Sequence, residues 1–191
     1  SNIPPSPSIL LTENFGTGPN TSIPEVDPAY CYEPQNGTVN SCGWAINNRI
    51  QDGEYSVTQN IVNPYGSWLS PNDHSGLPNG RFLAMNVGGA VGPNGIIYAK
   101  RGIEVVPNRD ISISLWAFNL LRNGTGGADP DIDIQLVDGG GTVIASTTTG
   151  NVPKNNGAND WQNYSVTLNP GGNTNLDIVI RTNSAVTGGN D

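Results

Sequence analysis

The sequence predicts an all-β protein, a two-sheet antiparallel β-sandwich of the jelly-roll type. Three observations predict it. Apolar and polar residues alternate with a period of two in several short segments, which is the pattern of strands with one buried face. Turn-forming residues separate these segments, because the chain holds 25 glycines and 15 prolines. No segment combines the 3.6-residue period of an amphipathic helix with helix caps.

In the first half of the chain the strand signals are short. Residues 1–8 hold three prolines and are interpreted as an extended leader or linker. A first strand is expected over 9–15, and a long irregular insertion follows over 19–43. Further strands are expected at 55–58 and 81–87. The polar loop between these two strands contains the only histidine of the chain.

The second half of the chain alternates more regularly. The clearest strand covers 111–118, where Ile111, Ile113 and Leu115 share one face. The glycine-rich turn at 138–141 predicts a hairpin. The strands expected in this half are 96–100 and 103–106 (two strands or one bent strand), 111–118, 131–137, 142–148, 161–168 and 175–182. The total is nine or ten strands, all antiparallel, in a single domain over 9–191.

Composition and charge exclude several classes of function. The net charge is −8 and only eight residues are basic, which disfavours nucleic-acid binding because that needs many lysines and arginines to neutralise phosphates. No apolar stretch approaches the roughly 20 residues of a membrane span. The acidic surface suits a secreted protein and offers oxygen ligands for calcium. Simple solubility explains the same acids equally well.

The two cysteines, Cys31 and Cys42, lie in the irregular insertion. No second Cys or His pair accompanies them, so a zinc site is disfavoured. A disulfide between them would remove roughly 3 kcal/mol of chain entropy from the unfolded state. We therefore expect a disulfide and an extracytoplasmic location, with two free core cysteines as the alternative.

Short motifs along the chain carry a family resemblance. In order they are Phe15, Cys42-Gly43-Trp44, Ser67-Trp68, Asp73-His74-Ser75-Gly76, Gly80-Arg81-Phe82, Ser114-Leu115-Trp116, Asp160-Trp161 and Gly188-Gly189-Asn190-Asp191. This order resembles the MAM-like extracellular jelly-roll domains and related modules of large bacterial surface adhesins and carbohydrate-binding proteins. The resemblance implies an extracellular or cell-surface adhesion module, which other domains of a large protein would accompany.

The chain departs from that family in two ways. MAM-type domains carry further cysteines, whereas this chain has two. Such domains also continue after the Gly-Asn-Asp run into a last apolar strand with more acids, so the domain over 9–191 would lack its last strand. A missing strand leaves an unpaired sheet edge, which favours association with another strand.

The resemblance also implies a structural calcium between the first strand, a loop and the end of the chain. The matching positions are Glu13, Asn14, Asp73 with its loop carbonyls, Asn190 and Asp191. Carboxylates, amide oxygens and carbonyls are the ligands that calcium prefers. The alternative is that Glu13 is a solvated strand edge and Asp191 a frayed end.

Five residues are candidates for ligand binding. Trp68 lies in a Gly/Ser/Pro/Asn-rich loop, where an exposed indole could stack on a sugar ring. Asn119 and Arg122 follow the clearest strand and supply hydrogen-bonding groups. Asp131 and Asp133 share one strand face. These two could bind sugar hydroxyls or a cation, or act as a glycosidase pair; the simplest alternative is the polar face of a sandwich strand.

Catalysis is the least favoured class. Asp73, His74 and Ser75 are adjacent in sequence, which is the wrong arrangement for a triad assembled in space. Trp116 and Trp161 lie in predicted strands and are expected in the core. The sequence therefore predicts a non-enzymatic, calcium-stabilised binding or adhesion module for a glycan or an exposed peptide. The alternatives are a structural spacer domain of a surface protein and, more remotely, a glycoside hydrolase.

Overall fold

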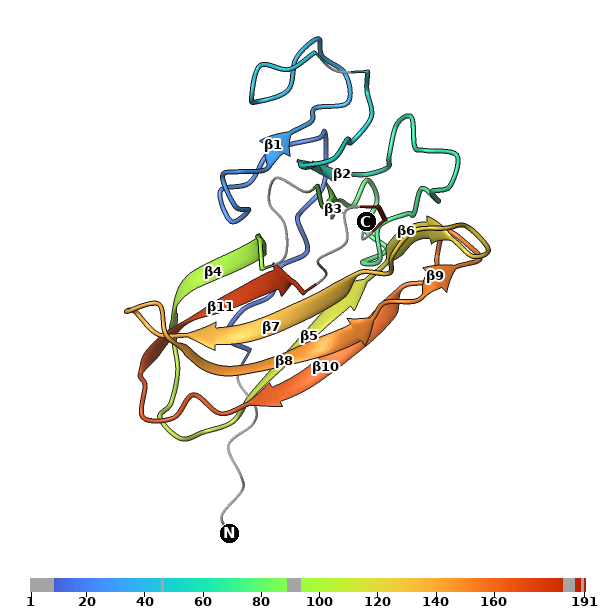
Figure 1. Cartoon of the computed structure of the whole chain (residues 1–191). Coiled ribbons are helices and arrows are strands. Elements are labelled where there is room, and N and C mark those ends of the chain that lie inside the picture. The colour runs from blue at the N-terminus through green and yellow to red at the C-terminus, as the bar shows by residue number, and fades with distance from the viewer. Residues whose placement is uncertain (1–8, 46, 89–93, 184–187, 190) are drawn as a thin grey trace.

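The structure is a computed structural model that describes residues 9–45, 47–88, 94–183, 188–189 and 191. The described residues form eleven strands and no α-helix (Figure 1), which confirms the all-β prediction. The strands are β1 (Cys31–Tyr32), β2 (Glu54–Thr58), β3 (Phe82–Asn86), β4 (Ile96–Glu104), β5 (Ile111–Ala117), β6 (Asn119–Arg122), β7 (Asp131–Val137), β8 (Val143–Asn151), β9 (Lys154–Asn155), β10 (Gln162–Leu168) and β11 (Asn175–Thr182). A helix of the length and apolarity required to cross a membrane is not found in the described segments.

Two antiparallel sheets make up the larger part of the molecule. One has four strands in the order β4-β11-β7-β8. The other pairs β10 with β5 along their full lengths, from Gln162 opposite Ala117 to Leu168 opposite Ile111. In Figure 1, β5 crosses behind β7 and β8. The long strands predicted for the second half of the chain are therefore confirmed.

A shared apolar cluster joins these two sheets. Ile134 and Leu136 of β7 are fully buried in it. Leu168 of β10 and Leu176 of β11 complete its buried centre. The inward side chains of β5 pack against this centre and remain half-buried. Burial of these side chains is the main force that holds the sheets together, because apolar burial contributes about 25 cal/mol per Å².

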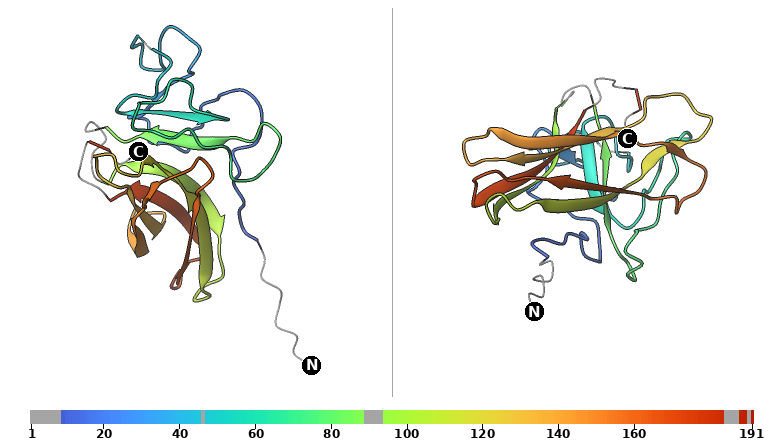
Figure 2. Two further views of the ribbon diagram at one scale, coloured as in Figure 1. Left: turned by 90° about the vertical axis from the view of Figure 1, so that its right-hand side faces the viewer. Right: turned by 90° about the horizontal axis from the view of Figure 1, so that it is seen from below.

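A smaller three-stranded sheet, in the order β1-β2-β3, carries the disulfide. Cys31 and Cys42 are bonded, with their Cα atoms 5.6 Å apart. In Figures 1 and 2 this sheet and its loops lie to one side of the two larger sheets. Phe82 and Ala84 of β3 pack with Leu120 of β6, so one core cluster links this part to the rest.

The first predicted strand, over 9–15, is wrong. No strand forms there, because two side chains bond the backbone of their own segment. The Glu13 Oε1 accepts from the Phe15 N–H at 2.6 Å, and the Asn14 Oδ1 accepts from the Gly16 N–H at 3.0 Å. Such local bonds replace the ladder that a strand would need.

The segments 96–100 and 103–106 form largely one strand, β4, which is the second of the two expected arrangements. Its pairing with β11 shifts register where Arg101 and Gly102 meet Asp177. The prediction that all strands are antiparallel is corrected, since β1 runs parallel to β2 and β6 runs parallel to β9. The strands β1, β6 and β9 have two to four residues, which is too short for a period-two signal. The leader predicted over 1–8 lies outside the described residues.

The disulfide closes a loop with a sequence separation of 11 residues. We predict that the double substitution of Cys31 and Cys42 by serine lowers the free energy of unfolding by about 2–3 kcal/mol, because the unfolded chain regains entropy. Urea denaturation monitored by tryptophan fluorescence measures this change. Reduction with a phosphine should give the wild type the same loss and leave the double variant unchanged. An equal midpoint for oxidised wild type and double variant would contradict the prediction.

Candidate functional site

The loop over 71–80 is held rigidly across the end of β5 and β10. The Trp161 indole N–H donates to the Asn72 carbonyl at 2.9 Å. Within the loop, the Asp73 carboxylate accepts from both the backbone N–H and the hydroxyl of Ser75. A Cβ at Gly80 would meet the Asp73 carboxylate, so a larger residue there would have to displace this side chain. The loop therefore presents its tip in a defined conformation.

The tip of this loop stacks on an exposed tryptophan. The His74 ring lies 3.7 Å from the Trp116 ring between centroids, with an interplanar angle of 28°. Trp161 lies beside the same imidazole at 6.2 Å. Trp116 nevertheless remains 47% exposed. An aromatic ring that is fixed on one side and open to solvent is a preorganised surface for stacking.

Trp116 stands on the outer face of β5 because the inner face is apolar. Ile113 and Leu115 point into the core cluster, so Ser114 and Trp116 point away from it. Opposite them on β10, the outward side chains are polar as well. The exposed residues of this outer face are Ser112, Ser114, Trp116, Asn163, Ser165 and Thr167. The face thus combines one aromatic ring with hydroxyl and amide groups.

A large apolar groove begins beside the same cluster. It has a volume of about 910 Å³, and His74, Trp116 and Trp161 are among its lining residues. From there it continues along β5 and past β4 and β11. The aromatic cluster of His74, Trp116 and Trp161 therefore lies next to the groove, and β5 contributes to both.

Two of the predicted ligand-binding residues lie in the core. Trp68 is only 3% exposed, and its indole N–H donates to the Asp191 carboxylate at 3.2 Å. Asn119 is fully buried and donates to the Asp129 carboxylate at 3.0 Å and to the Val152 carbonyl at 2.9 Å. The expectation that Trp68 presents an open ring is corrected, because its loop folds over the apolar cluster of Ile50 and its neighbours.

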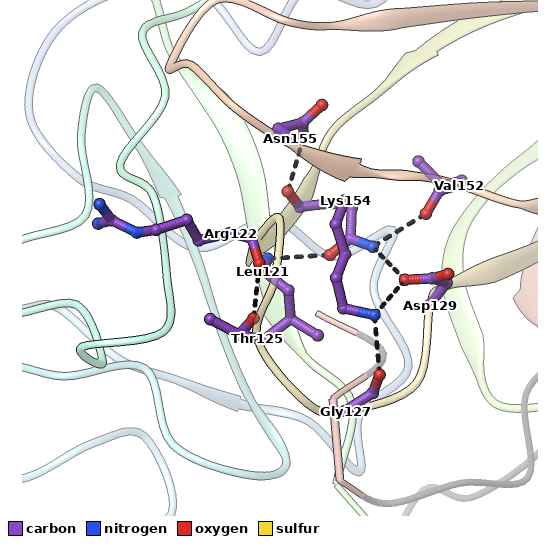
Figure 3. Close-up of polar contacts among 9 residues, drawn as sticks. Leu121, Arg122, Thr125, Gly127, Asp129, Val152, Lys154 and Asn155 are labelled. Atoms are coloured by element: carbon purple, nitrogen blue, oxygen red, sulfur yellow. Dashed lines mark hydrogen bonds and ion pairs between the residues drawn. The ribbon is translucent and has the colours of Figure 1, made fainter.

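Asn119 belongs to a closed polar network between β6 and β9. Its partners Asp129, Val152 and Asn155 are labelled in Figure 3. Lys154 forms an ion pair with Asp129 at 2.7 Å and also donates to the Gly127 carbonyl at 2.9 Å. The Asn155 side chain donates to the Asn119 carbonyl at 2.8 Å. This network satisfies every polar atom of the Asn119 amide with protein partners. The network therefore stabilises the fold and leaves the Asn119 amide no free group for a ligand.

The other three predicted ligand residues are more accessible, but they do not meet at one point. The exposed Arg122 donates to the Trp68 carbonyl at 3.2 Å. Asp131 and Asp133 are half-buried on one face of β7. Asp131 accepts from the Asn183 amide at 3.0 Å, and Asp133 accepts from the Gln135 amide at 2.6 Å. Of these three residues, only Asp131 lines the groove.

The residues predicted to bind calcium are each engaged separately. Glu13 and Asn14 bond backbone N–H groups, and Asp73 caps its own loop. The described residues contain no cluster of three or more His, Cys, Asp or Glu that could hold a metal ion, and Asn190 lies outside them. In this region the Arg81 guanidinium binds the carbonyls of Phe15 and Pro19, at 2.8 and 2.9 Å. Calcium binding by Glu13, Asn14, Asp73 and Asp191 stays a prediction.

Asp191 occupies an unusual environment for a carboxylate. Its Oδ2 accepts from Trp68, whereas its Oδ1 is buried without a hydrogen-bond partner. Burial raises the pKa of Asp191 to about 7, the Trp68 bond partly opposes this, and the Asp52 charge adds to it. The residue therefore supports the fold best in its protonated form.

Trp116, which has an open aromatic surface near the loop, is not among the residues that the sequence predicts to bind a ligand. The signal was present in the alternation of 111–118, which places residue 116 opposite the apolar face. Trp116 is predicted to lie in the core because an indole is hydrophobic, although the periodicity of the strand places it on the outer face. The stacking partner His74 carries no sequence signal for its contact, because the two residues lie in separate segments.

Comparison with known proteins gives little further information. No family model and no curated protein matches the chain. One solved structure with local similarity is that of the enzymatically active domain of tailspike protein 4 of bacteriophage CBA120. It is 21% identical, with a TM-score of 0.31, over 51% of this chain and 13% of the tailspike chain. The matched part is a small portion of that larger protein.

The buried network predicts a structural role for Asn119. The substitution Asn119→Ala should lower the free energy of unfolding by about 2–3 kcal/mol, because it leaves the partners of a buried amide unsatisfied. The exposed Arg122→Ala serves as the matched control and should change stability by less than about 0.5 kcal/mol. Chemical denaturation of the two variants measures both values. Equal stability of the two variants would contradict the assignment.

The raised pKa of Asp191 predicts that the stability of the fold depends on pH. Its pKa is about 7 in the folded protein against an ordinary value of 3.8, so its stabilising contribution is complete below pH 3.8 and is lost as the pH rises to about 7. Between pH 5 and pH 8 the wild type should therefore lose more stability than Asp191→Asn. Melting temperatures of both proteins across this range test the difference. Parallel curves would show that Asp191 titrates normally.

Proposed function

We propose that this chain is an extracellular binding module, of the jelly-roll type, that recognises glycans on the outer face of β5 and β10. One observation carries the proposal: Trp116 is 47% exposed while His74 stacks against it. An indole normally avoids water, so an exposed one that is held in place indicates a contact surface. The flat ring matches the apolar face of a pyranose.

Polar groups around Trp116 would fix the orientation of the sugar. Asn163 lies opposite Trp116 in the strand register, and Ser114 precedes it on the same face. Both side chains can exchange hydrogen bonds with hydroxyl groups. The Asp73 carboxylate of the neighbouring loop is a further acceptor. A few placed polar groups around an apolar contact are the usual composition of a small-ligand site.

This site is shallow and built on one principal ring, so weak affinity is expected. A dissociation constant of about 0.1–1 mM corresponds to about 4–5 kcal/mol, which one stacking contact and a few exposed hydrogen bonds can supply. Weak single sites are useful when several modules act together on one surface. We therefore propose adhesion to a polymeric glycan, with binding and no cleavage.

The extracellular location rests on the disulfide. Disulfides persist in oxidising compartments and are rare in reducing ones. The bond between Cys31 and Cys42 therefore indicates an oxidising environment. The acidic net charge of −8 agrees with a soluble secreted module.

A structural spacer is the second candidate function. It is favoured by the burial of Trp68 and Asn119, because these two residues stabilise the fold and offer no surface to a ligand. A spacer needs no exposed aromatic ring, however. The exposure of Trp116 therefore separates the two candidates and supports glycan binding.

The glycan proposal predicts that Trp116→Ala weakens binding. Glycan-array screening identifies a bound polysaccharide, and isothermal titration then compares the variants. Trp116→Ala should weaken binding at least about tenfold, since the main stacking contact is lost. Trp44→Ala is the matched control, because Trp44 is 55% exposed and lies next to the disulfide, two residues after Cys42.

Two outcomes would overturn the glycan proposal. One is an array without any bound glycan, which would favour the spacer. The other is equal loss of affinity in Trp116→Ala and Trp44→Ala, which would show that exposed indoles bind nonspecifically. Release of reducing sugar ends by the wild type would contradict binding without cleavage.

A further inference from the structure

The groove is a large unfilled feature beside the described strands. Its volume is about 910 Å³, at the upper end of the range for small-molecule sites. Apolar side chains from several strands line it, among them Ile97 and Ile103 of β4, Ile113 and Leu115 of β5, and Ile178 of β11. Unlike a compact pocket, it runs past every residue of β5. Its shape suits an elongated ligand.

One wall of the groove is a free sheet edge. β5 pairs with β10 on one side and stands at the end of its sheet. On its other side, no backbone hydrogen bond from another described segment reaches it. A strand edge of this kind offers a row of N–H and C=O groups to a further strand. The groove thus provides main-chain bonding as well as apolar contact.

The inward side chains of β5 also leave apolar surface uncovered. Ile111, Ile113 and Leu115 are only half-buried, although Ile134 and Leu136 in the facing sheet are fully buried. Alternate residues of a strand lie about 6.6–6.8 Å apart on one face. A ligand that covers the exposed parts of these side chains must therefore place apolar groups at the same spacing. An extended peptide with apolar residues at alternate positions does this.

Charge at the groove specifies the peptide further. The acids that line it are Glu13, Asp73, Glu104, Asp110, Asp131 and Asp191. Two arginines, Arg81 and Arg109, oppose them. Arg81 is already engaged by the carbonyls of Phe15 and Pro19. The groove therefore has an excess of negative charge, which favours basic residues at the ends of a peptide.

We propose that the groove binds an extended segment of another polypeptide by strand addition to β5. The segment carries apolar side chains at alternate positions and basic residues at its ends. Main-chain hydrogen bonds to β5 supply affinity, and the apolar groove selects the alternating side chains. The peptide site lies beside the glycan surface, because Trp116 presents its ring on the outer face and also lines the groove, whereas the peptide lies along the edge and inner face of β5.

The proposal is tested with a synthetic peptide that matches the length of β5, 7 residues, and alternates valine with serine between lysine ends. Fluorescence anisotropy should show saturable binding. Amide hydrogen exchange should show new protection along β5. N-methylation of alternate backbone nitrogens on one edge of the peptide should weaken binding at least about tenfold, because it removes the donors to β5. The same methylation on the other edge should be tolerated.

Protein variants test the charge requirement without touching the core. Glu104 is exposed and lines the groove. The substitution Glu104→Lys should therefore weaken binding of the lysine-ended peptide about fivefold and strengthen binding of a glutamate-ended peptide. Asp52→Lys is the control, since Asp52 is exposed and outside the groove. Equal effects of the two variants, or a preference of the wild type for glutamate ends, would overturn the charge assignment.

Three results would overturn strand addition itself: no saturable binding, equal effects of the two methylated peptides, or protection confined to strands other than β5. A failure of glycan binding leaves this test intact, because none of its measurements uses a sugar. Conversely, a bound glycan without peptide binding would refute the groove proposal alone. The two proposals are therefore separable by experiment.

Discussion

The packing of β5 and β10 against the four-stranded sheet determines which side chains of this protein face solvent. The apolar cluster around Ile134 and Leu136 can be filled from β5 only by alternate residues. Once Ile113 and Leu115 turn inward, Trp116 must turn outward. A shift of one residue would bury the tryptophan and expose the isoleucines, at a large cost in apolar burial. The candidate site is thus a consequence of the core.

The disulfide-bearing part of the molecule is stabilised differently. Its interior holds two fully buried carboxylates, Glu33 and Glu54. Glu54 accepts two bonds, from the Asn40 amide at 2.6 Å and from the Gln51 N–H at 2.7 Å. Glu33 has one oxygen without a partner, and burial raises its pKa, so protonation reduces the cost of burying it. This part also has an apolar cluster of its own around Tyr30, Tyr55 and Met85, so the disulfide adds to apolar burial and offsets the cost of the buried acids.

Sequence periodicity was sufficient for the long strands and insufficient elsewhere. The strands β5, β7, β10 and β11 follow from the alternation of apolar and polar residues over seven or eight positions, although β7 and β11 bury side chains on both faces. Pairing partners and the parallel direction of β1 depend on contacts between distant segments, which no local pattern contains. The same limit applies to Trp68 and Asn119. Loop composition indicated exposure, whereas tertiary packing folded both residues into the core.

Of the four end strands of the two larger sheets, β4 and β5 border the groove, and their free edges differ. The edge of β4 is protected: the Ala99 N–H donates to the Glu25 carbonyl at 2.8 Å, and the Asp27 N–H donates to the Ile96 carbonyl at 3.3 Å.

Farther along β4, a charged residue, Arg101, and a left-handed glycine, Gly102, interrupt the edge. Bulges, charges and covering segments are the devices by which proteins prevent unwanted strand pairing. β5 contains none of them, since its sequence is Ile-Ser-Ile-Ser-Leu-Trp-Ala without charge or proline. A chain that protects one edge and leaves the other regular, uncharged and lined by a groove has the features of a strand acceptor at β5.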